Sequence, residues 1–413
     1  MPKAIVSPAA TGLQAPPHVP SELVFDVDAF ALPGQDDDVQ LAWVEVQQTH
    51  PDIFWTPRNG GHWIATRAAD IATMQADHTR FSFKRILIPD IGRPFPVLPL
   101  DKDPPEHAAY RLMLSPAFSP AMVARLGQRV RAVAVAAIES FRLQGRCEFV
   151  QDFAKVLPIH LFLEMVDLPH AEARFLLPFA ERIARSSDPK EITAARLALA
   201  DYVRTIIAER QGRGGTDLIS HIIHYRVNGA ELSEAEKLGT CSNLLAAGLD
   251  TVAGMLGFAA SFLARHPAHR RQLIEDPSLV PVAVDELIRR HGVVNTGRLV
   301  VADIDYNGIA MKAGDMVQLP NCLYGLDERK VERPLEVDFG RAQVDHAAFG
   351  NGPHRCPGAI LARREMNTFL TEFLGRIPEF RIAEGTRPKQ SSGLINGMQR
   401  LELEWDPAST RAL

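Results

Sequence analysis

The sequence predicts a mainly α fold, an α+β arrangement in which a helical body is accompanied by a small β-rich region. Three observations predict it. Several long segments place apolar residues three and four positions apart, which is the spacing of one face of a helix. Strand-like stretches are short. No glycine-rich phosphate-binding fingerprint follows any of them, which argues against a nucleotide-binding Rossmann unit.

The first long helix is expected over 120–142, where Ser119 supplies a cap and Pro120 stands in the first turn. A continuous apolar run, 244–264, raises the alternative of a membrane span. It carries Asp250 and three glycines, and a carboxylate inside a membrane is costly, so we expect a helix buried in a protein core. The other expected helices are 153–165, 194–211, 233–266, 281–291 and 359–377.

The expected strands are short and lie mostly in the C-terminal half. Tyr306-Asn-Gly308 predicts a hairpin turn between two of them, because Asn-Gly favours the tight turn that joins antiparallel strands. The strand-like stretches are 61–66, 298–301, 304–306, 315–319 and 401–404.

Composition indicates an ordinary folded protein of a reducing compartment. The chain has 413 residues, of which 46% are hydrophobic, and its net charge of −5 indicates no attraction to nucleic acid or membranes. Its four cysteines are scattered without a Cys-x-x-Cys pair, which argues against disulfides or a zinc site and favours a cytoplasmic location. The cysteines are Cys147, Cys241, Cys322 and Cys356.

No segment of the chain has the composition of a linker between domains. We therefore expect one domain over residues 1–413, although length alone would allow two or three. Residues 1–20 are rich in proline and alanine and lack the charged and apolar regions of a signal peptide. They are expected to form a flexible N-terminal arm.

The most informative motif is Phe349-Gly-Asn-Gly-Pro-His-Arg-Cys356-Pro-Gly358. It places Cys356 on a glycine-rich turn directly before an expected helix, where helix-terminal N–H groups stabilise a thiolate. The glycines leave room for a large flat group against the sulfur. An inert buried cysteine is the alternative.

This motif resembles the haem-ligand loop of the cytochrome P450 family, in which a cysteine thiolate binds the haem iron. The resemblance extends over nearly the whole chain and is strongest to the soluble bacterial class that includes camphor 5-monooxygenase. It implies the cytochrome P450 fold, haem b as cofactor and Cys356 as axial ligand. The further segments that carry it are Leu249-Asp-Thr-Val252, Gly325-Leu-Asp-Glu-Arg329, Val337-Asp-Phe339, Leu361-Ala-Arg-Arg-Glu365 and Trp405-Asp-Pro407.

Four residues match the family's positions for binding the haem propionates, which need cationic or hydrogen-bonding partners. His107 and Arg111 stand four residues apart, on one face of a helix expected to begin after Pro104 and Pro105. Arg298 and His354 complete the set. Taken singly, each of the four is better explained as a surface or capping residue, and only their joint match to the family's positions favours propionate binding.

Glu286 and Arg289 resemble the family's Glu-x-x-Arg element, a buried structural ion pair behind the haem. A solvated helix pair is the alternative. The family usually adds an arginine from the segment before the cysteine loop. The matching position here is Glu336, so the third partner is left open.

Asp250 and Thr251 lie in the middle of the long apolar helix, where their helix propensity is poor. They resemble the family's acid–alcohol pair, in which the hydroxyl acts in oxygen activation with an ordered water and the carboxylate passes protons inward. Arg185 is expected to pair with Asp250. A threonine that bonds back to a helix carbonyl is the alternative.

Phe95 stands where the camphor enzyme carries the tyrosine that holds the ketone of its substrate, so the resemblance implies a pocket without that donor. The neighbouring positions are apolar except for one amide, and ordinary core packing is the alternative for each of them. The remaining pocket candidates are Leu87, Val97, Leu100, Asn243, Leu244, Ala247, Val293, Val294, Leu394 and Ile395.

The resemblance implies a monooxygenase that hydroxylates a small apolar terpenoid or norisoprenoid with O2. No flavin or nicotinamide motif is visible, so electrons are expected from a [2Fe-2S] ferredoxin with its reductase, docked around Cys356. Gln343 and Ala108 stand where the camphor enzyme carries basic residues. A peroxide-driven haem enzyme and a non-catalytic haem sensor are the alternatives. The acid–alcohol pair argues against the first, and the absence of a partner module argues against the second.

Overall fold

The computed structural model describes residues 14–92, 94–213 and 215–412. Residues 1–13 of the expected flexible arm lie outside the described residues. Its described part, 14–20, packs against the rest of the protein. The side chain of His18 lies 2.9 Å from the Asp315 carboxylate, and Val19 is buried.

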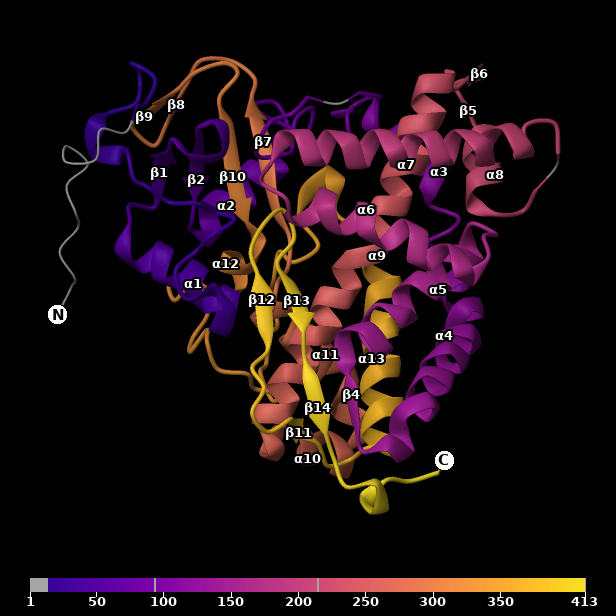
Figure 1. Ribbon diagram of the computed structural model, residues 1–413. Helices are drawn as coiled ribbons and strands as arrows, with labels where there is room; N and C mark the ends of the chain where they lie inside the picture. The colour runs from indigo at the N-terminus through magenta and orange to yellow at the C-terminus, as the bar shows by residue number, and fades with distance from the viewer. Residues whose placement is uncertain (1–13, 93, 214, 413) are drawn as a thin grey trace.

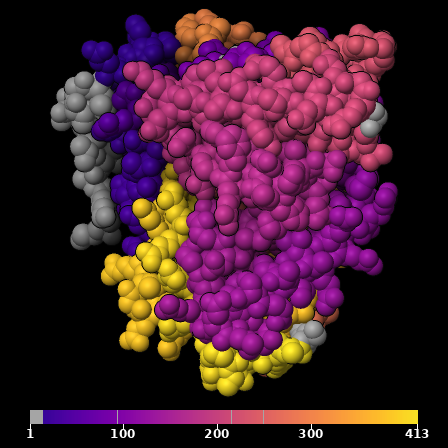
Figure 2. Space-filling view, turned by 45° about the vertical axis from the view of Figure 1, so that its right-hand side comes forward, coloured from indigo at the N-terminus to yellow at the C-terminus, as the bar shows by residue number. Residues whose placement is uncertain are grey.

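Helices make up most of the structure, as predicted. In Figure 1 most of them form a body on one side of the molecule, while α1, α2 and α12 lie beside the five-stranded sheet. Figure 2 shows a face that is largely covered by α4 to α8. The helices are α1 Gln35–Thr49, α2 Ala68–Ala76, α3 His107–Leu114, α4 Pro120–Phe141, α5 Val156–Met165, α6 Ala173–Arg185, α7 Pro189–Arg210, α8 Leu218–Ile223, α9 Glu234–Arg265, α10 Pro267–Glu275, α11 Val280–Arg290, α12 Asn321–Leu326 and α13 Ala359–Arg376.

The ends of the long helices follow from local capping. α4 begins where it was expected, because the Ser119 hydroxyl accepts the N–H of Met122. α9 begins with a capping box between Ser233 and Glu236. α7 begins earlier than the expected 194, because Asp188 caps it.

The strands form one five-stranded sheet, in the order β1-β2-β10-β7-β3, and several small ones. The five-stranded sheet lies opposite the helical body in Figure 1. β10 pairs in parallel with β2, and the other pairs of this sheet are antiparallel. The strands are β1 Ile53–Thr56, β2 His62–Ala65, β3 Phe81–Ser82, β4 Arg146–Glu148, β5 Arg226–Val227, β6 Ala230–Glu231, β7 Asn295–Val300, β8 Ile304–Tyr306, β9 Ile309–Met311, β10 Met316–Pro320, β11 Arg381–Ile382, β12 Lys389–Ser391, β13 Gly397–Arg400 and β14 Glu402–Glu404.

The expected hairpin turn is present, but it joins a different pair of strands. Asn307 and Gly308 have φ angles of 53° and 83°, the left-handed conformations of a two-residue turn. The turn connects β8 to β9, which is too short to stand out in the sequence. The strand expected over 315–319 is β10, which pairs with β7 and β2 instead.

Helix α9 runs through the middle of the protein and packs against α5, α6, α7, α13 and β13. Among the described residues, α9 is the one helix that is long and apolar enough to cross a membrane. Of its most apolar stretch, 71% is buried inside the protein. This agrees with the expected core helix. The N-terminal half of α9 packs in a hydrophobic cluster with α6–α8, and its C-terminal half packs in a second cluster with α11, α13 and the sheet. The helix therefore joins the two cores.

Candidate functional site

The loop that carries Cys356 is held in one conformation by short contacts. It joins a short 3-10 turn, Gly352–His354, to the start of α13. The N–H of Cys356 donates to the carbonyl of Phe349 at 2.9 Å. Gly352 has a φ of 69°, and a Cβ on it would lie 2.8 Å from the carbonyl oxygen of Gln75 in α2. Glycine is therefore required for the loop to lie this close to α2.

Cys356 lies deep in the protein but faces open space. Its side chain is accessible to solvent. Burial nevertheless raises the pKa of its thiol, while the Gly358 N–H and the charge of Arg111 act to lower it. Both observations hold if Sγ lies on the wall of an internal cavity. The helix-terminal N–H group and the nearby cation would stabilise a thiolate that binds a metal in that cavity.

His107, His354 and Arg298, three of the four expected propionate partners, meet around Phe83. The ring centroids of the two histidines are 4.2 Å apart, and Phe83 stacks on His354 at 3.8 Å. The Arg298 guanidinium lies 3.6 Å from the centroid of the Phe83 ring. The structure thus brings together residues from α3, the cysteine loop and β7.

Each of these three residues carries a buried nitrogen without a hydrogen-bond partner: Nε2 of His107, Nε2 of His354 and Nε of Arg298. Burial lowers the pKa of His107 to about 4 and the pKa of Arg298 to about 9. Unsatisfied buried donors are costly, and anionic acceptors would satisfy them. The arrangement fits the two propionates of a haem.

An acidic residue, Asp103, borders this cluster. Burial raises the pKa of its carboxyl group, but interactions with His354, the Ser82 hydroxyl and the Phe83 N–H lower that pKa to about 2. The distance from Asp103 Oδ1 to His354 Nε2 is 3.8 Å, which is too long for a hydrogen bond. Asp103 therefore lies beside His354 without accepting a hydrogen bond from its Nε2.

Arg111 lies on α3 one turn after His107, as expected, but it is directed elsewhere. Its Nη2 donates to the carbonyl of Arg355 at 2.5 Å. Burial lowers its pKa, and the nearby Cys356 raises it. Arg111 is therefore placed beside the cysteine loop, where it is close enough to act on both the loop and the cavity.

Asp250 and Thr251 lie on α9, and the carboxylate of Asp250 is buried. Its Oδ1 accepts from Arg185 Nη2 at 2.7 Å, which is the expected pairing, and its Oδ2 has no partner. The Thr251 hydroxyl donates to the carbonyl of Ala247 at 3.3 Å. This long contact is the back-bonding geometry of the alternative interpretation, and it leaves the oxygen of Thr251 able to accept.

Three expected site residues share one face of α9. Asn243, Ala247 and Thr251 are spaced by four residues, and residues at this spacing lie above one another. Ala247 is exposed although it belongs to the middle of a core helix, so this face borders open space. The amide, the methyl group and the hydroxyl therefore line one path along the helix.

Part of the expected substrate pocket is brought together in a small cavity between α6, α7, α9 and the loop before α3. Phe95, Val97 and Asn243 line it. Phe95 also lines an open groove on its other side, together with Leu87. Leu100 lines neither, and Leu244 packs at the edge of a hydrophobic cluster. Phe95 is thus a partition between an inner and an outer space.

The other four pocket candidates gather at the entry to β7. Val294 forms a bridge with Ile395, and the carbonyl of Leu394 accepts the N–H of Asn295. Val293 is fully buried and lies against α9 near Gly254. Val293 therefore packs in the core between the entry to β7 and α9.

The loop that carries Phe95 touches α9 at Gly239. A Cβ on Gly239 would lie 2.1 Å from the carbonyl oxygen of Pro96 and 2.8 Å from the Cβ of Phe95. The N–H of Leu98 donates to the Thr240 hydroxyl at 3.0 Å. The loop is therefore fixed to the helix directly beside the cavity.

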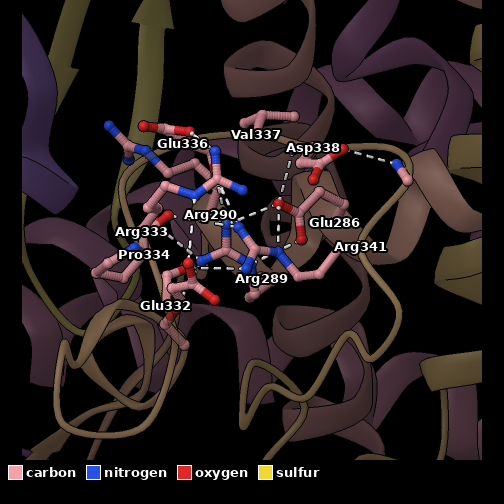
Figure 3. A network of polar contacts seen from close by, with 12 residues as sticks. Glu286, Arg289, Arg290, Glu332, Arg333, Pro334, Glu336, Val337, Asp338 and Arg341 are labelled. Atoms are coloured by element: carbon pink, nitrogen blue, oxygen red, sulfur yellow. Dashed lines mark hydrogen bonds and ion pairs between the residues drawn. The ribbon is translucent and has the colours of Figure 1, made fainter.

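Glu286 and Arg289 form the expected buried ion pair on α11, shown in Figure 3. Arg289 Nε lies 2.7 Å from Glu286 Oε2, and neither side chain is exposed. Arg341 also donates to the same carboxylate, from Nε to Oε1 at 3.1 Å. Two guanidinium groups therefore share one buried carboxylate.

The third partner, which the sequence left open, is not supplied by Glu336, the residue at the matching position. Its carboxylate pairs with Arg333 at 2.9 Å in an exposed ion pair, and only its carbonyl accepts from Arg289. The missing arginine is Arg341, at the end of Asp338-Phe-Gly-Arg341. The chain turns back toward α11 after Asp338, whose N–H also donates to Glu286. An arginine shortly after Val337-Asp-Phe339 was the available sequence signal.

Sequence reasoning did not single out the residues of α6 and α7 at the cavity. Ile183, Arg196, Leu199 and Ala200 line it. They look like ordinary residues of amphipathic helices, because a helical pattern shows which face is buried but not against what. No local signal distinguishes Arg196 from the other arginines of α7.

Known proteins match this chain over most of its length. Residues 274–399 match the sequence profile of the family described as Cytochrome P450. Over 400 residues the chain is 34% identical to the probable cytochrome P450 127A1 of Sinorhizobium fredii (strain NBRC 101917 / NGR234), and the match spans 94% of this chain and 96% of that relative.

Two crystal structures are similar in backbone as well. The structure of CYP101J2 has a TM-score of 0.87 and 37% sequence identity. The structure of cytochrome P450 CYP101C1 has a TM-score of 0.86 and 38% identity. Each match covers 95% of this chain and 100% of the other chain.

Proposed function

The chain belongs to the cytochrome P450 family, and on this premise we propose that it hydroxylates a small apolar terpenoid or norisoprenoid. It is a monooxygenase with the cytochrome P450 fold and binds haem b. The observation that carries the proposal is the shared face of α9, on which the cavity residue Asn243 and the hydroxyl of Thr251 lie on one line. A substrate in the cavity would therefore extend toward the reacting centre.

In the proposed site, the thiolate of Cys356 would bind the haem iron. His107, Arg298 and His354 would hold the propionates, with Arg111 beside the cysteine loop as the fourth partner. The orphaned nitrogens and lowered pKa values of His107 and Arg298 support this assignment. When bound, haem supplies the oxygen chemistry of the reaction. The protein supplies the sulfur ligand, a largely apolar cavity and a route for protons.

The proton route is proposed to run through Asp250 and Thr251. Arg185 holds Oδ1 of Asp250, so Oδ2 is the oxygen that remains available to carry a proton. The Thr251 hydroxyl lies one residue further along α9 and can accept or donate a hydrogen bond toward the cavity. A proton can then pass from Asp250 by way of water to the side of the cavity that Thr251 faces.

Thr251→Ala is expected to retain haem and substrate affinity but to divert electrons into hydrogen peroxide, because the hydroxyl acts after substrate binding. Asp250→Asn is expected to slow turnover by on the order of 10²-fold through the loss of proton delivery. The measurement is the ratio of hydroxylated product to hydrogen peroxide. Ser261→Ala, which removes a buried hydroxyl elsewhere on α9, serves as the control. Normal rate and coupling in both variants would contradict the relay.

Electrons are proposed to come from a [2Fe-2S] ferredoxin and its reductase in the cytoplasm, with docking around Cys356. Turnover with these partners and a nicotinamide reductant is expected to exceed turnover with hydrogen peroxide alone. Small terpenoids that shift the haem spin state identify the substrates for this comparison. Equal or faster hydroxylation with peroxide alone would contradict the ferredoxin-dependent function and favour a peroxygenase.

Phe95→Tyr is expected to raise the affinity for camphor by up to about tenfold, because a tyrosine hydroxyl can donate to the ketone and a phenylalanine cannot. The wild type is expected to bind camphor weakly and to hydroxylate it at several positions. Larger or more apolar substrates, such as ionone-like norisoprenoids, are held better by burial alone.

The measurement for Phe95 is a camphor titration followed by the haem spin shift. Phe175→Tyr, which changes a partly exposed phenylalanine on α6, is the matched control and is expected to leave the affinity unchanged. Tight and regiospecific camphor turnover by the wild type would overturn the assignment of Phe95. An unchanged affinity in Phe95→Tyr would overturn it as well.

A further inference from the structure

Arg196 is a cation placed among apolar residues. It lies on α7 and lines the small cavity together with Phe95, Ile183, Leu199 and Ala246. Its Nε has no contact with solvent. None of the residues that line this cavity is acidic. The guanidinium group therefore faces a largely apolar space without a negative charge beside it.

The guanidinium of Arg196 has no hydrogen bond or ion pair with any residue that the structure describes, and its Nε is unsatisfied. Burial lowers the pKa of this side chain, and no neighbouring charge opposes the shift. Arg210 on the same helix shows the contrast. Arg210 is more deeply buried than Arg196, and it pairs with the carboxylate of Asp217 and donates to the carbonyl of Asp167.

The other polar groups of the cavity do not satisfy Arg196. The Ser242 hydroxyl donates to the carbonyl of Leu238 on its own helix. The amide of Asn243 faces the same cavity from α9, across from α7. The polar lining is therefore one unpaired guanidinium opposite one amide. This donor set suits an acceptor with more than one oxygen.

The size of the cavity indicates what it holds. Its volume is about 30 Å³. This is room for roughly two water molecules, and thus for a polar head group rather than a whole terpenoid. The body of a substrate would extend from the head group along the face of α9 toward Ala247 and Thr251. Arg196 and the reacting centre would then hold opposite ends of one molecule.

We propose that Arg196 binds a carboxylate on the substrate, and that the substrates are terpenoid or norisoprenoid monocarboxylic acids. A guanidinium binds a carboxylate in a bidentate geometry, and the anion offsets the cost of a half-buried charge among apolar residues. Asn243 would donate to the same head group. This inference rests on the proposed function, because it assigns the polar end of the substrate that the proposed enzyme hydroxylates. Arg196 is then a specificity-determining residue.

The test is a spin-shift titration of the haem-loaded enzyme with two probes of one skeleton, perillic acid and perillyl alcohol. The wild type is expected to bind the acid more tightly than the alcohol. Arg196→Gln is expected to weaken acid binding about ten- to hundredfold and to leave alcohol binding nearly unchanged, because charge-assisted hydrogen bonds are lost. Arg196→Lys keeps the charge and is expected to fall between the two.

Arg204→Gln is the matched control, because Arg204 is an exposed arginine of α7 that pairs with Asp201. It is expected to bind both probes like the wild type. The preference of the wild type for the acid needs no variant, so the test stands even if Arg196→Gln does not fold. Wild-type binding that favours the alcohol would overturn the inference. Equal loss of both probes in Arg196→Gln would also overturn it.

The carboxylate anchor and the proposed function would fail in different ways. If the enzyme binds and hydroxylates the alcohol but gains nothing from the carboxylate, the anchor is wrong and the proposed function stands. If neither probe nor any neutral terpenoid shifts the spin state of the intact haem enzyme, both are wrong. Acid binding that depends on Arg196, followed by hydroxylation of the acid, supports both.

Discussion

The Cys356→His protein is expected to lose the red-shifted Soret band of the reduced, carbon monoxide-bound state and, with it, monooxygenase activity. Imidazole donates less electron density to iron than a thiolate does. The loss of activity is expected to be complete within detection, because no other described cysteine can replace Cys356. The other three, Cys147, Cys241 and Cys322, are buried in the core. This is the largest effect on function.

The measurement is the difference spectrum of the reduced protein with and without carbon monoxide, with haem content measured separately. Cys241→Ala is the matched control. Burial raises the pKa of this thiol to about 12, so it is an inert thiol that contributes only packing. It is expected to keep the band. A Cys356→His protein that retained the red-shifted band would remove Cys356 from the iron.

Glu286→Gln is expected to destabilise the protein by about 3–5 kcal/mol, because it leaves buried guanidinium groups without their carboxylate. Arg289 and Arg341 both point at this one acid in Figure 3, and none of its surface is exposed. The free energy of unfolding in urea, followed by circular dichroism, measures the change. The helix and the loop before Cys356 are joined through this carboxylate, so the variant is also expected to lose haem at lower urea concentration.

Glu336→Gln is the control for that experiment. Glu336 pairs with Arg333 at the surface, where an ion pair contributes about 0–1 kcal/mol. Its effect on the free energy of unfolding is expected to be correspondingly small. If Glu286→Gln and Glu336→Gln proved equally stable, the buried carboxylate would not be what holds α11 to the chain before the cysteine loop.

The sequence predicted well those features that a short stretch of chain determines by itself. Ser119 and Ser233 cap their helices with groups three residues away, so the starts of α4 and α9 were predictable. The motif around Cys356 likewise contains its own turn and its own helix start. The roles of these residues in catalysis remain predictions, because they concern a bound cofactor.

Features that depend on distant segments were predicted poorly. Arg341 reaches Glu286 from a segment 55 residues further along the chain. Matching of motifs gave Glu336 at the corresponding position and therefore left the third partner open. Val293 is buried against α9, and its assignment to the pocket stays a prediction. Arg196 has no mark in the sequence at all. Arg196 stands out because its Nε has no hydrogen-bond partner among the described residues. This can be recognised only in the folded structure, where all the residues around the cavity are known.

The contact between Gly239 and Pro96 bears on how such an enzyme could acquire new substrates. With 2.1 Å between the carbonyl of Pro96 and the place of a Cβ on Gly239, the loop has no room to move toward α9, and an outward shift would break the bond between Leu98 and Thr240. The wall at Phe95 is thus rigid, and its shape can change only by exchange of side chains. Variation by mutagenesis should therefore be concentrated on Phe95 and on the α7 positions facing it, while Gly239 is kept constant.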